Sequence, residues 1–147
     1  MAITESKIWQ FINQYQKTKK DCHFIRVESS TINGIPDINA IMNGQEFWLE
    51  LKVNQGNNLG LSKYQILWHL KRLRANGNCY ILHSTDTRPK VELLRIRESR
   101  SENLVPSFEN LVSISRSNPR WSLMVRDVLE WLQRSPGFYS PNRKLDK

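Results

Sequence analysis

The stretch Gly34–Lys52, GIPDINAIMNGQEFWLELK, predicts a β-hairpin around which the rest of the chain is organised. Asn43 and Gly44 separate two runs rich in β-branched and aromatic residues. Asn-Gly is the pair that best tolerates the positive φ angles of a two-residue hairpin turn. With this pair as the loop, Met42 pairs with Gln45, and the register of the two strands, expected over residues 35–42 and 46–53, is fixed.

This register brings charged side chains of both signs to one edge of the hairpin. Asp37 lies directly opposite Glu50, and Lys52 projects from the same face as Glu50. Opposed positions have Cβ atoms roughly 4.5–5.5 Å apart, and like charges held there destabilise a sheet. A cation between them removes this cost, and carboxylate oxygens suit a hard divalent ion such as Mg²⁺ or Mn²⁺. The lysine then completes a set that suits phosphodiester cleavage.

At these residues the sequence resembles the PD-(D/E)xK nuclease superfamily. Pro36-Asp37 matches the first half of the motif, and Glu50-Leu51-Lys52 matches the second. The resemblance implies that Asp37, Glu50 and the backbone carbonyl of Leu51 hold Mg²⁺ or Mn²⁺. It also implies that Lys52 positions or deprotonates the attacking water.

The same order of motifs continues downstream, where Ser62 and Gln65 form a Ser-x-x-Gln start to a basic helix. In this respect the chain is similar to small phage, junction-resolving and VRR-type nucleases, and to the restriction-fold homing endonucleases of cyanobacterial introns. The resemblance covers about residues 3–83. Gln65 is implied to place the water or phosphate, whereas its alternative role is structural, because Ser62 and Gln65 also form a capping box.

The expected fold class is α/β, a restriction-endonuclease-like mixed β-sheet flanked by helices, with a C-terminal strand and helix extension. One nuclease domain, 1–147, comprises a core of about 3–97 and an extension of about 98–147. Helical periodicity predicts helices over 4–17 and 62–75 and a third that begins at Asn118-Pro119. Further strands are expected at 23–28, at 78–83 and, as an edge strand, at 91–97. Residues 98–117 look irregular, 54–60 resemble a mobile loop, and 138–147 form a basic tail.

Two glutamates compete for an additional acidic role. Glu5 shares the inward face of the first helix with Ile8 and Ile12, and the resemblance implies that a glutamate there joins the metal site. Its alternative role is that of a first-turn acid favoured by the helix dipole. Glu28 lies on the same strand face as Arg26, and the alternative for this residue is a surface charge pair.

Composition predicts a folded protein with a polyanionic partner. The 147 residues are 39% hydrophobic with five Trp, and 22 Lys and Arg outnumber 14 Asp and Glu, for a net charge of +8 and a pI of about 9.8. Apolar runs stay well below 18 residues, and we expect a soluble, cytoplasmic protein in a bacterial or phage-type context. Cys22 and Cys79 stand in neither a disulfide nor a zinc pattern.

The helix 62–75 carries a basic face and a predicted buried stripe of Ile66, Leu67, Leu70 and Leu73, with His69 in solvent. Residues expected to contact DNA are polar or basic side chains near the hairpin, on this helix and on the last strand. They are Arg26, Ser62, Lys63, Lys71, Arg72, Arg74, Arg95 and Arg97.

The resulting prediction is a metal-dependent DNA endonuclease with catalytic residues Asp37, Glu50, Lys52, Gln65 and Glu5. A basic C-terminal third without known motifs favours site-specific, homing-type cutting of double-stranded DNA. The alternative is a structure-specific nuclease that cleaves junctions or flaps. A non-catalytic DNA-binding module would be expected to lose part of the motif. One active site per chain predicts a homodimer or homotetramer.

Overall fold

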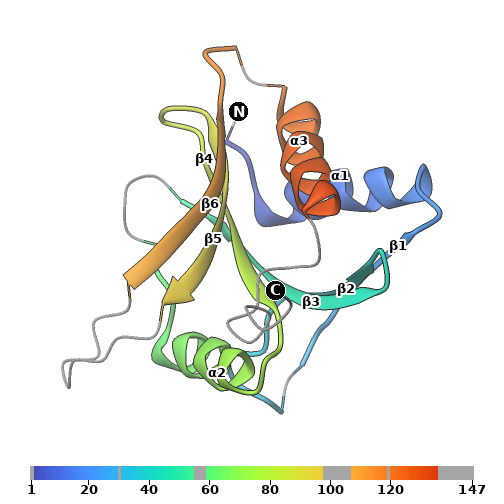
Figure 1. The fold of residues 1–147 in the computed structure, drawn as a ribbon. Coiled ribbons are helices and arrows are strands. Elements are labelled where there is room, and N and C mark those ends of the chain that lie inside the picture. The colour runs from blue at the N-terminus through green and yellow to red at the C-terminus, as the bar shows by residue number, and fades with distance from the viewer. Residues whose placement is uncertain (1, 30, 55–58, 98–106, 119, 136–147) are drawn as a thin grey trace.

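The computed structural model describes residues 2–29, 31–54, 59–97, 107–118 and 120–135. In this part of the chain the strands form one sheet of six, in the order β1-β2-β3-β4-β5-β6 (Figure 1). Only β3 and β4 run parallel; the other neighbours are antiparallel. The elements are α1 (Glu5–Lys17), β1 (Cys22–Arg26), β2 (Ile38–Met42), β3 (Gln45–Val53), α2 (Lys63–Arg74), β4 (Cys79–Thr85), β5 (Lys90–Arg97), β6 (Ser107–Ser115) and α3 (Trp121–Arg134).

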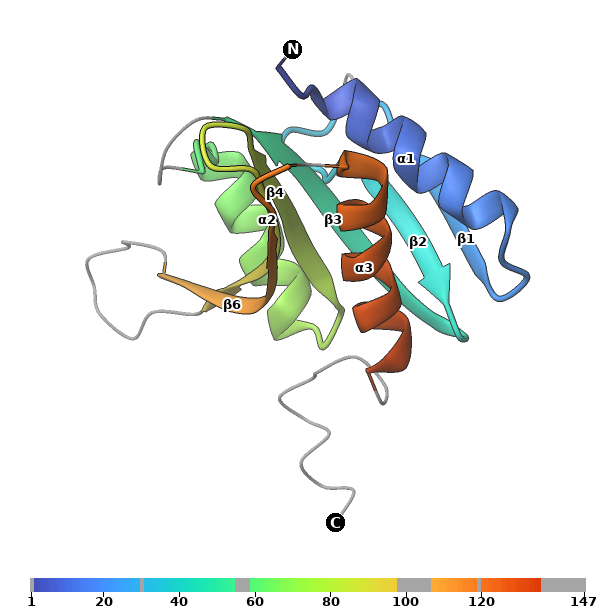
Figure 2. The same ribbon diagram turned by 90° about the horizontal axis from the view of Figure 1, so that it is seen from above.

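The helices lie on both faces of the sheet, which confirms the predicted α/β class with a mixed sheet. Figure 2 shows α1 and α3 side by side over one face, with α2 on the other. The larger apolar cluster lies under α1 and α3 and includes Ile8, Ile12 and Phe47. The smaller cluster joins α2 to β4 and β5 and includes Leu70 and Ile81. None of the helices in the described ranges is long and apolar enough to span a membrane.

The hairpin has the predicted register. Met42 pairs with Gln45, and Ile38 pairs with Leu49 at the far end of the ladder. Asn43 takes a positive φ of 53°, as expected of an Asn-Gly turn. Strand β2 is three residues shorter than predicted, because it begins at Ile38 rather than at residue 35. Pro36 lacks a backbone N–H, so the regular ladder does not continue through it.

Three expectations about the C-terminal part are wrong. Residues 107–115 form β6, although 98–117 looked irregular, and β5 is therefore an interior strand rather than an edge strand. The helix α3 begins at Trp121 with Arg120 as N-cap, not at Asn118. Its buried residues include Met124, Val125, Val128, Leu129 and Leu132. The described residues after 97 thus complete the same sheet and core.

Within α2 the burial differs from the prediction at two positions. Leu67 is 45% exposed, while His69 is fully buried. The sheet-facing side of the helix is therefore turned toward His69 and Leu70, with Ile66 and Leu73 partly buried beside them. Of the loop predicted over 54–60, residues 55–58 lie outside the described residues, as does the whole basic tail 138–147.

Candidate functional site

Asp37 lies immediately before β2 and bonds to the neighbouring strand through its side chain. The backbone N–H of Leu51 donates to Oδ2 of Asp37 at 2.8 Å. If β2 continued toward the N-terminus, one of its backbone carbonyls would accept a hydrogen bond from the Leu51 amide. The ladder is interrupted at Pro36, and Oδ2 of Asp37 accepts this bond instead. The N–H and C=O of a strand residue point toward the same neighbour. The carbonyl of Leu51 is therefore directed toward the side where Asp37 lies.

Glu50 is the buried carboxyl group of this corner. Its side chain is 2% exposed, and its Oε1 is buried without a hydrogen-bond partner. Burial is the main cause that raises the pKa of Glu50 to about 10, and the hydrogen bond to Asp37 and the charge of Asp37 contribute to the same rise. In the absence of a cation, Glu50 therefore retains a proton at neutral pH.

Lys52 lies on the same face of β3 as Glu50 and is half-buried. The positive charge of Lys52 opposes the rise in the pKa of Glu50 and also that of Glu5. The ammonium group therefore belongs to the electrostatic environment of both carboxyl groups. The sequence-based expectation that Asp37, Glu50 and Lys52 share one corner agrees with this geometry.

Glu5, the first residue of α1, also reaches this corner from the opposite side of the strand end. Burial raises the pKa of Glu5 and the charge of Asp37 adds to this rise, while Lys52, Arg26 and the backbone N–H of Val53 oppose it. Thr4 caps the helix through a bond from Lys7 N to its Oγ1 at 3.1 Å, so Glu5 is not needed as the cap. The charges of Asp37 and Lys52 therefore act on Glu5, and its role as an additional acid stays a prediction.

A polar cavity of about 460 Å³ opens beside Asp37, between the segment 26–37 and the start of α2. Its wall includes Arg26, Glu28, Asp37, Ser62 and Gln65. Glu28 is exposed here, and it is Glu5 whose charge acts on Glu50. Of the two carboxyl groups of the corner, Asp37 lies on the wall of this cavity, while Glu50 is buried behind it.

Gln65 forms the capping box that its spacing suggested. Its Oε1 accepts from Ser62 N at 2.9 Å, and Ser62 Oγ accepts from Gln65 N at 3.2 Å. This bond occupies the amide oxygen of Gln65, so the side-chain NH₂ is the part of the residue that can act on a ligand. The structural role is thus present, and the functional role stays a prediction.

The predicted DNA contacts fall into two groups. Exposed side chains are found at Arg26, Ser62, Lys63, Lys71, Arg74 and Arg97. Arg72 and Arg95, which were also expected to contact DNA, are less exposed and have partners within the chain, so their DNA role stays a prediction. Arg72 stacks on the rings of Trp68 and Trp48 at 4.5 and 5.6 Å. Arg95 is 6% exposed and pairs with Glu109 on β6, a strand that was not predicted.

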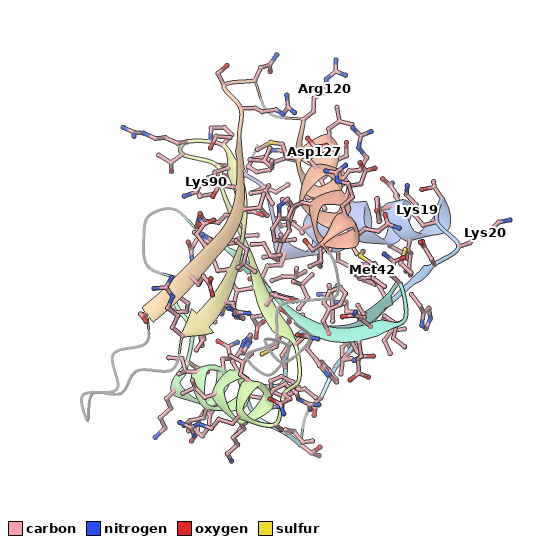
Figure 3. All side chains as sticks on the ribbon, in the orientation of Figure 1. Lys19, Lys20, Met42, Lys90, Arg120 and Asp127 are labelled. Carbon is pink, nitrogen blue, oxygen red and sulfur yellow. The ribbon has the colours of Figure 1, made fainter. Side chains whose placement is uncertain are left out.

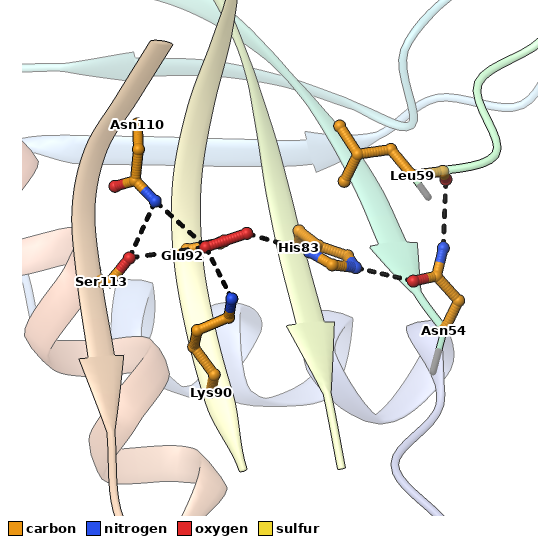
Figure 4. A network of polar contacts seen from close by, with 7 residues as sticks. All are labelled: Asn54, Leu59, His83, Lys90, Glu92, Asn110 and Ser113. Carbon is orange, nitrogen blue, oxygen red and sulfur yellow. Dashed lines mark hydrogen bonds and ion pairs between the residues drawn. The ribbon is translucent and has the colours of Figure 1, made fainter. Parts of the chain in front are cut away.

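Sequence reasoning missed a buried polar network next to Lys52 (Figure 4). In the parallel ladder Lys52 pairs with His83. The His83 ring lies 3.2 Å from Glu92 Oε1 through Nδ1 and 2.7 Å from Asn54 Oδ1 through Nε2. Asn54 Nδ2 donates to the Leu59 carbonyl, which orients the amide and leaves its oxygen toward His83. Both ring nitrogens of His83 therefore lie within hydrogen-bonding distance of a side-chain oxygen, one from Glu92 and one from Asn54.

The corner also suits a divalent cation. In the described part of the chain, no three His, Cys, Asp or Glu side chains gather as metal ligands. Asp37, Glu50 and the Leu51 carbonyl offer oxygen donors, and Oε1 of Glu50 is a buried acceptor that still needs a partner. One or two carboxylates with several waters are the usual protein contribution to a Mg²⁺ site. The residues present therefore fit Mg²⁺ or Mn²⁺.

Comparisons with protein-family models and with curated proteins found no match. Among solved structures, the chain is similar to Hjc, a Holliday junction resolvase from the archaeal hyperthermophile Archaeoglobus fulgidus. The two sequences are 19% identical, the TM-score is 0.47, and the match covers 69% of this chain and 86% of that chain. A likeness this distant does not carry the activity of Hjc over to this protein.

Proposed function

We propose that this protein is a divalent-metal-dependent DNA endonuclease. The observation that supports the proposal most directly is the corner where Asp37 accepts the Leu51 amide while Glu50 lies buried beside it with an unpartnered oxygen. A structural role would not require two carboxyl groups to be held together in a protein of net charge +8.

Each residue of the corner has a role that follows from its position. Asp37, Glu50 and the Leu51 carbonyl would hold Mg²⁺ or Mn²⁺, which supplies positive charge and lowers the pKa of bound water. Lys52 orients or deprotonates the attacking water and balances charge on the phosphate. Glu5 accepts the Val53 amide and adds negative charge beside Lys52. Gln65 and Arg26 line the cavity through which the phosphate backbone reaches Asp37.

Of the two substrate classes expected, we favour branched DNA over a long homing site. The homing prediction depended on a C-terminal extension free to read bases. In the described residues of that region, β6 pairs with β5 and α3 packs in the main core. These elements complete the fold, which leaves fewer side chains for base readout, whereas a junction nuclease needs only shape and phosphate contacts. We also infer a homodimer or homotetramer, because cutting two strands with one site per chain requires two copies.

The function is tested by incubating the protein with Mg²⁺ and supercoiled plasmid, a four-way junction or a flap of the same sequence. We expect cleavage of the junction, at paired positions in opposite strands, and loss of cleavage in EDTA. Asp37→Asn, Glu50→Gln and Lys52→Ala should each lower the cleavage rate by about 10²–10³-fold or more. Circular dichroism checks that these variants fold. Undiminished cleavage in EDTA would remove the metal from the proposal, and cleavage of plasmid alone at one site would restore the homing class.

A further inference from the structure

A polar row crosses the sheet from Lys52 to β6. By register Lys52 pairs with His83, His83 with Glu92, and Glu92 with Ser113. A second row lies on the same face of the sheet, two residues beyond the first row toward the C-terminal end of β4. It consists of Thr85, Lys90 and Ser115, which are again register partners.

This second row opens into a cavity of about 770 Å³ at the β4–β5 turn and the end of β6. The cations on its wall are Arg88, Lys90 and Arg116, and its hydroxyl groups include Thr87, Ser115 and Ser117. No carboxylate is among the described residues that line it. Both arginines are exposed. Guanidinium and hydroxyl donors without an acidic neighbour on the wall are what a phosphate group requires.

Two of the three cations of the cavity, Lys90 and Arg116, form ion pairs within the chain. Lys90 Nζ lies 3.1 Å from Glu92 Oε2, within the network of Figure 4, which fixes its stem at the edge of the cavity. Figure 3 shows Lys90 at the left of the view, far from Lys19 and Lys20 at the right. Arg116 pairs with Asp127 at 3.1 Å, and its side chain is 53% exposed. An ion pair this exposed contributes little, so a phosphate can replace it at small cost.

The register also gives the separation from the candidate active site. Lys90 is two strands from Lys52 across the sheet and two residues along it, which places their Cα atoms about 12 Å apart. Duplex DNA rises about 3.4 Å per base pair, so this separation spans three to four base pairs. A DNA arm that lies along this direction would therefore bring its backbone to both Lys52 and the cavity.

We propose that this cavity is a second phosphate-binding site, which holds the DNA backbone three to four nucleotides from the bond cleaved at Lys52. The proposal builds on the nuclease function proposed above. Arg88 and Arg116 provide the charge-assisted hydrogen bonds, and Ser115, Ser117 and Thr87 complete the donors. The contacts address phosphate alone, so the site adds affinity and register without sequence preference.

The test measures binding of a labelled four-way junction in EDTA, where cleavage is blocked, over a range of salt concentrations. Arg88→Ala with Arg116→Ala should weaken binding about tenfold at low salt and reduce the slope of log K against log salt by about 1 for each lost contact. Arg134→Ala is the matched control, since this exposed arginine ends α3 near the hairpin turn, at the other end of the sheet. It should leave affinity and slope unchanged.

A second arm locates the contact on the DNA. A methylphosphonate that removes one phosphate charge, placed three or four nucleotides from the cleaved bond, should weaken wild-type binding but have no further effect on the double variant. Equal losses in both proteins, or an unchanged salt slope in the variant, would overturn the second site and leave the nuclease proposal standing. If binding depends on Arg88 and Arg116 but the protein never cleaves, the nuclease proposal is overturned and the second phosphate site stands.

Discussion

The backbone amide of Leu51 donates to Oδ2 of Asp37 at 2.8 Å, and this bond joins the two halves of the candidate active site. It forms because β2 begins only at Ile38, after Pro36 has interrupted the ladder. The side chain of Asp37 therefore serves two purposes, closure of the hairpin and placement of a carboxylate next to Glu50. The segment before Asp37 packs closely on the start of α2, where Gly34 meets the backbone of Tyr64 and Gln65.

Gly34 supports the segment that carries Asp37. Its φ is +84°, and a Cβ there would overlap the carbonyl of Tyr64 and come within 2.8 Å of Gln65 N. We expect Gly34→Ala to lower the free energy of unfolding by about 2 kcal/mol or more and to reduce cleavage, because the segment must move away from α2. Gly44→Ala is the control, since Gly44 has a similar φ of +77° but open space around it. Urea unfolding and cleavage rates are measured for both variants. Equal losses in Gly34→Ala and Gly44→Ala would contradict the close packing of Gly34 on α2.

His69 makes stability depend on pH. Burial lowers the pKa of His69 to about 4, and neither ring nitrogen has a hydrogen-bond partner. Between pH 6.5 and 4, His69 is protonated in the unfolded chain but stays neutral in the folded chain. The contribution of His69 to the free energy of unfolding is therefore greatest above pH 6.5 and falls as the pH drops. The loss should reach on the order of 3 kcal/mol near pH 4. Urea unfolding of wild type and His69→Leu checks this, with a flatter pH profile expected in the variant. An unchanged slope would show that other groups carry the dependence.

The pair His83 and Glu92 should contribute to stability at neutral pH. The hydrogen bond from His83 lowers the pKa of Glu92, with help from Lys90 and against the effect of burial. A lowered pKa stabilises the fold above about pH 4.5, and this contribution disappears as the pH falls through the folded-state pKa. We expect His83→Gln to cost about 3 kcal/mol at pH 7 and less at pH 3.

Ser113→Ala is the control for this pair, because its hydroxyl contacts the same carboxylate at 3.4 Å from the exposed side. It should cost less than about 1 kcal/mol. Thermal or urea unfolding at both pH values separates the two variants. A His83→Gln protein as stable as wild type at pH 7 would mean that the buried pair contributes no net stability.

Arg72 should act in folding rather than in DNA binding. Its guanidinium stacks on Trp68 and Trp48, so Arg72→Ala is expected to lower stability by about 1–2 kcal/mol with DNA affinity unchanged. Lys71→Ala, on the exposed side of the same turn, should leave stability within about 0.5 kcal/mol. Tryptophan fluorescence during unfolding and a DNA-binding titration distinguish the two. Reduced affinity for folded Arg72→Ala would return this residue to the DNA contacts.

Much of the candidate site is predictable because it depends on local chemistry. The Asn43-Gly44 turn sets the hairpin register through a few neighbouring residues, and the opposition of Asp37 and Glu50 follows from it. The capping box of Ser62 and Gln65 is equally local. Glu5 required one additional inference, the inward face of α1, and its link to Asp37 and Lys52 then depended on how the helix packs.

The sequence by itself determined the helices, the hairpin and the cluster of Asp37, Glu50 and Lys52, because turn geometry and side-chain periodicity act over a few residues. Only the tertiary structure decided which strand lies beside β3. The parallel pairing of β3 with β4 places His83 next to Lys52, and the addition of β6 buries Arg95 against Glu109. These contacts join residues far apart in the chain, and their energies depend on burial and strand order, which no local pattern encodes.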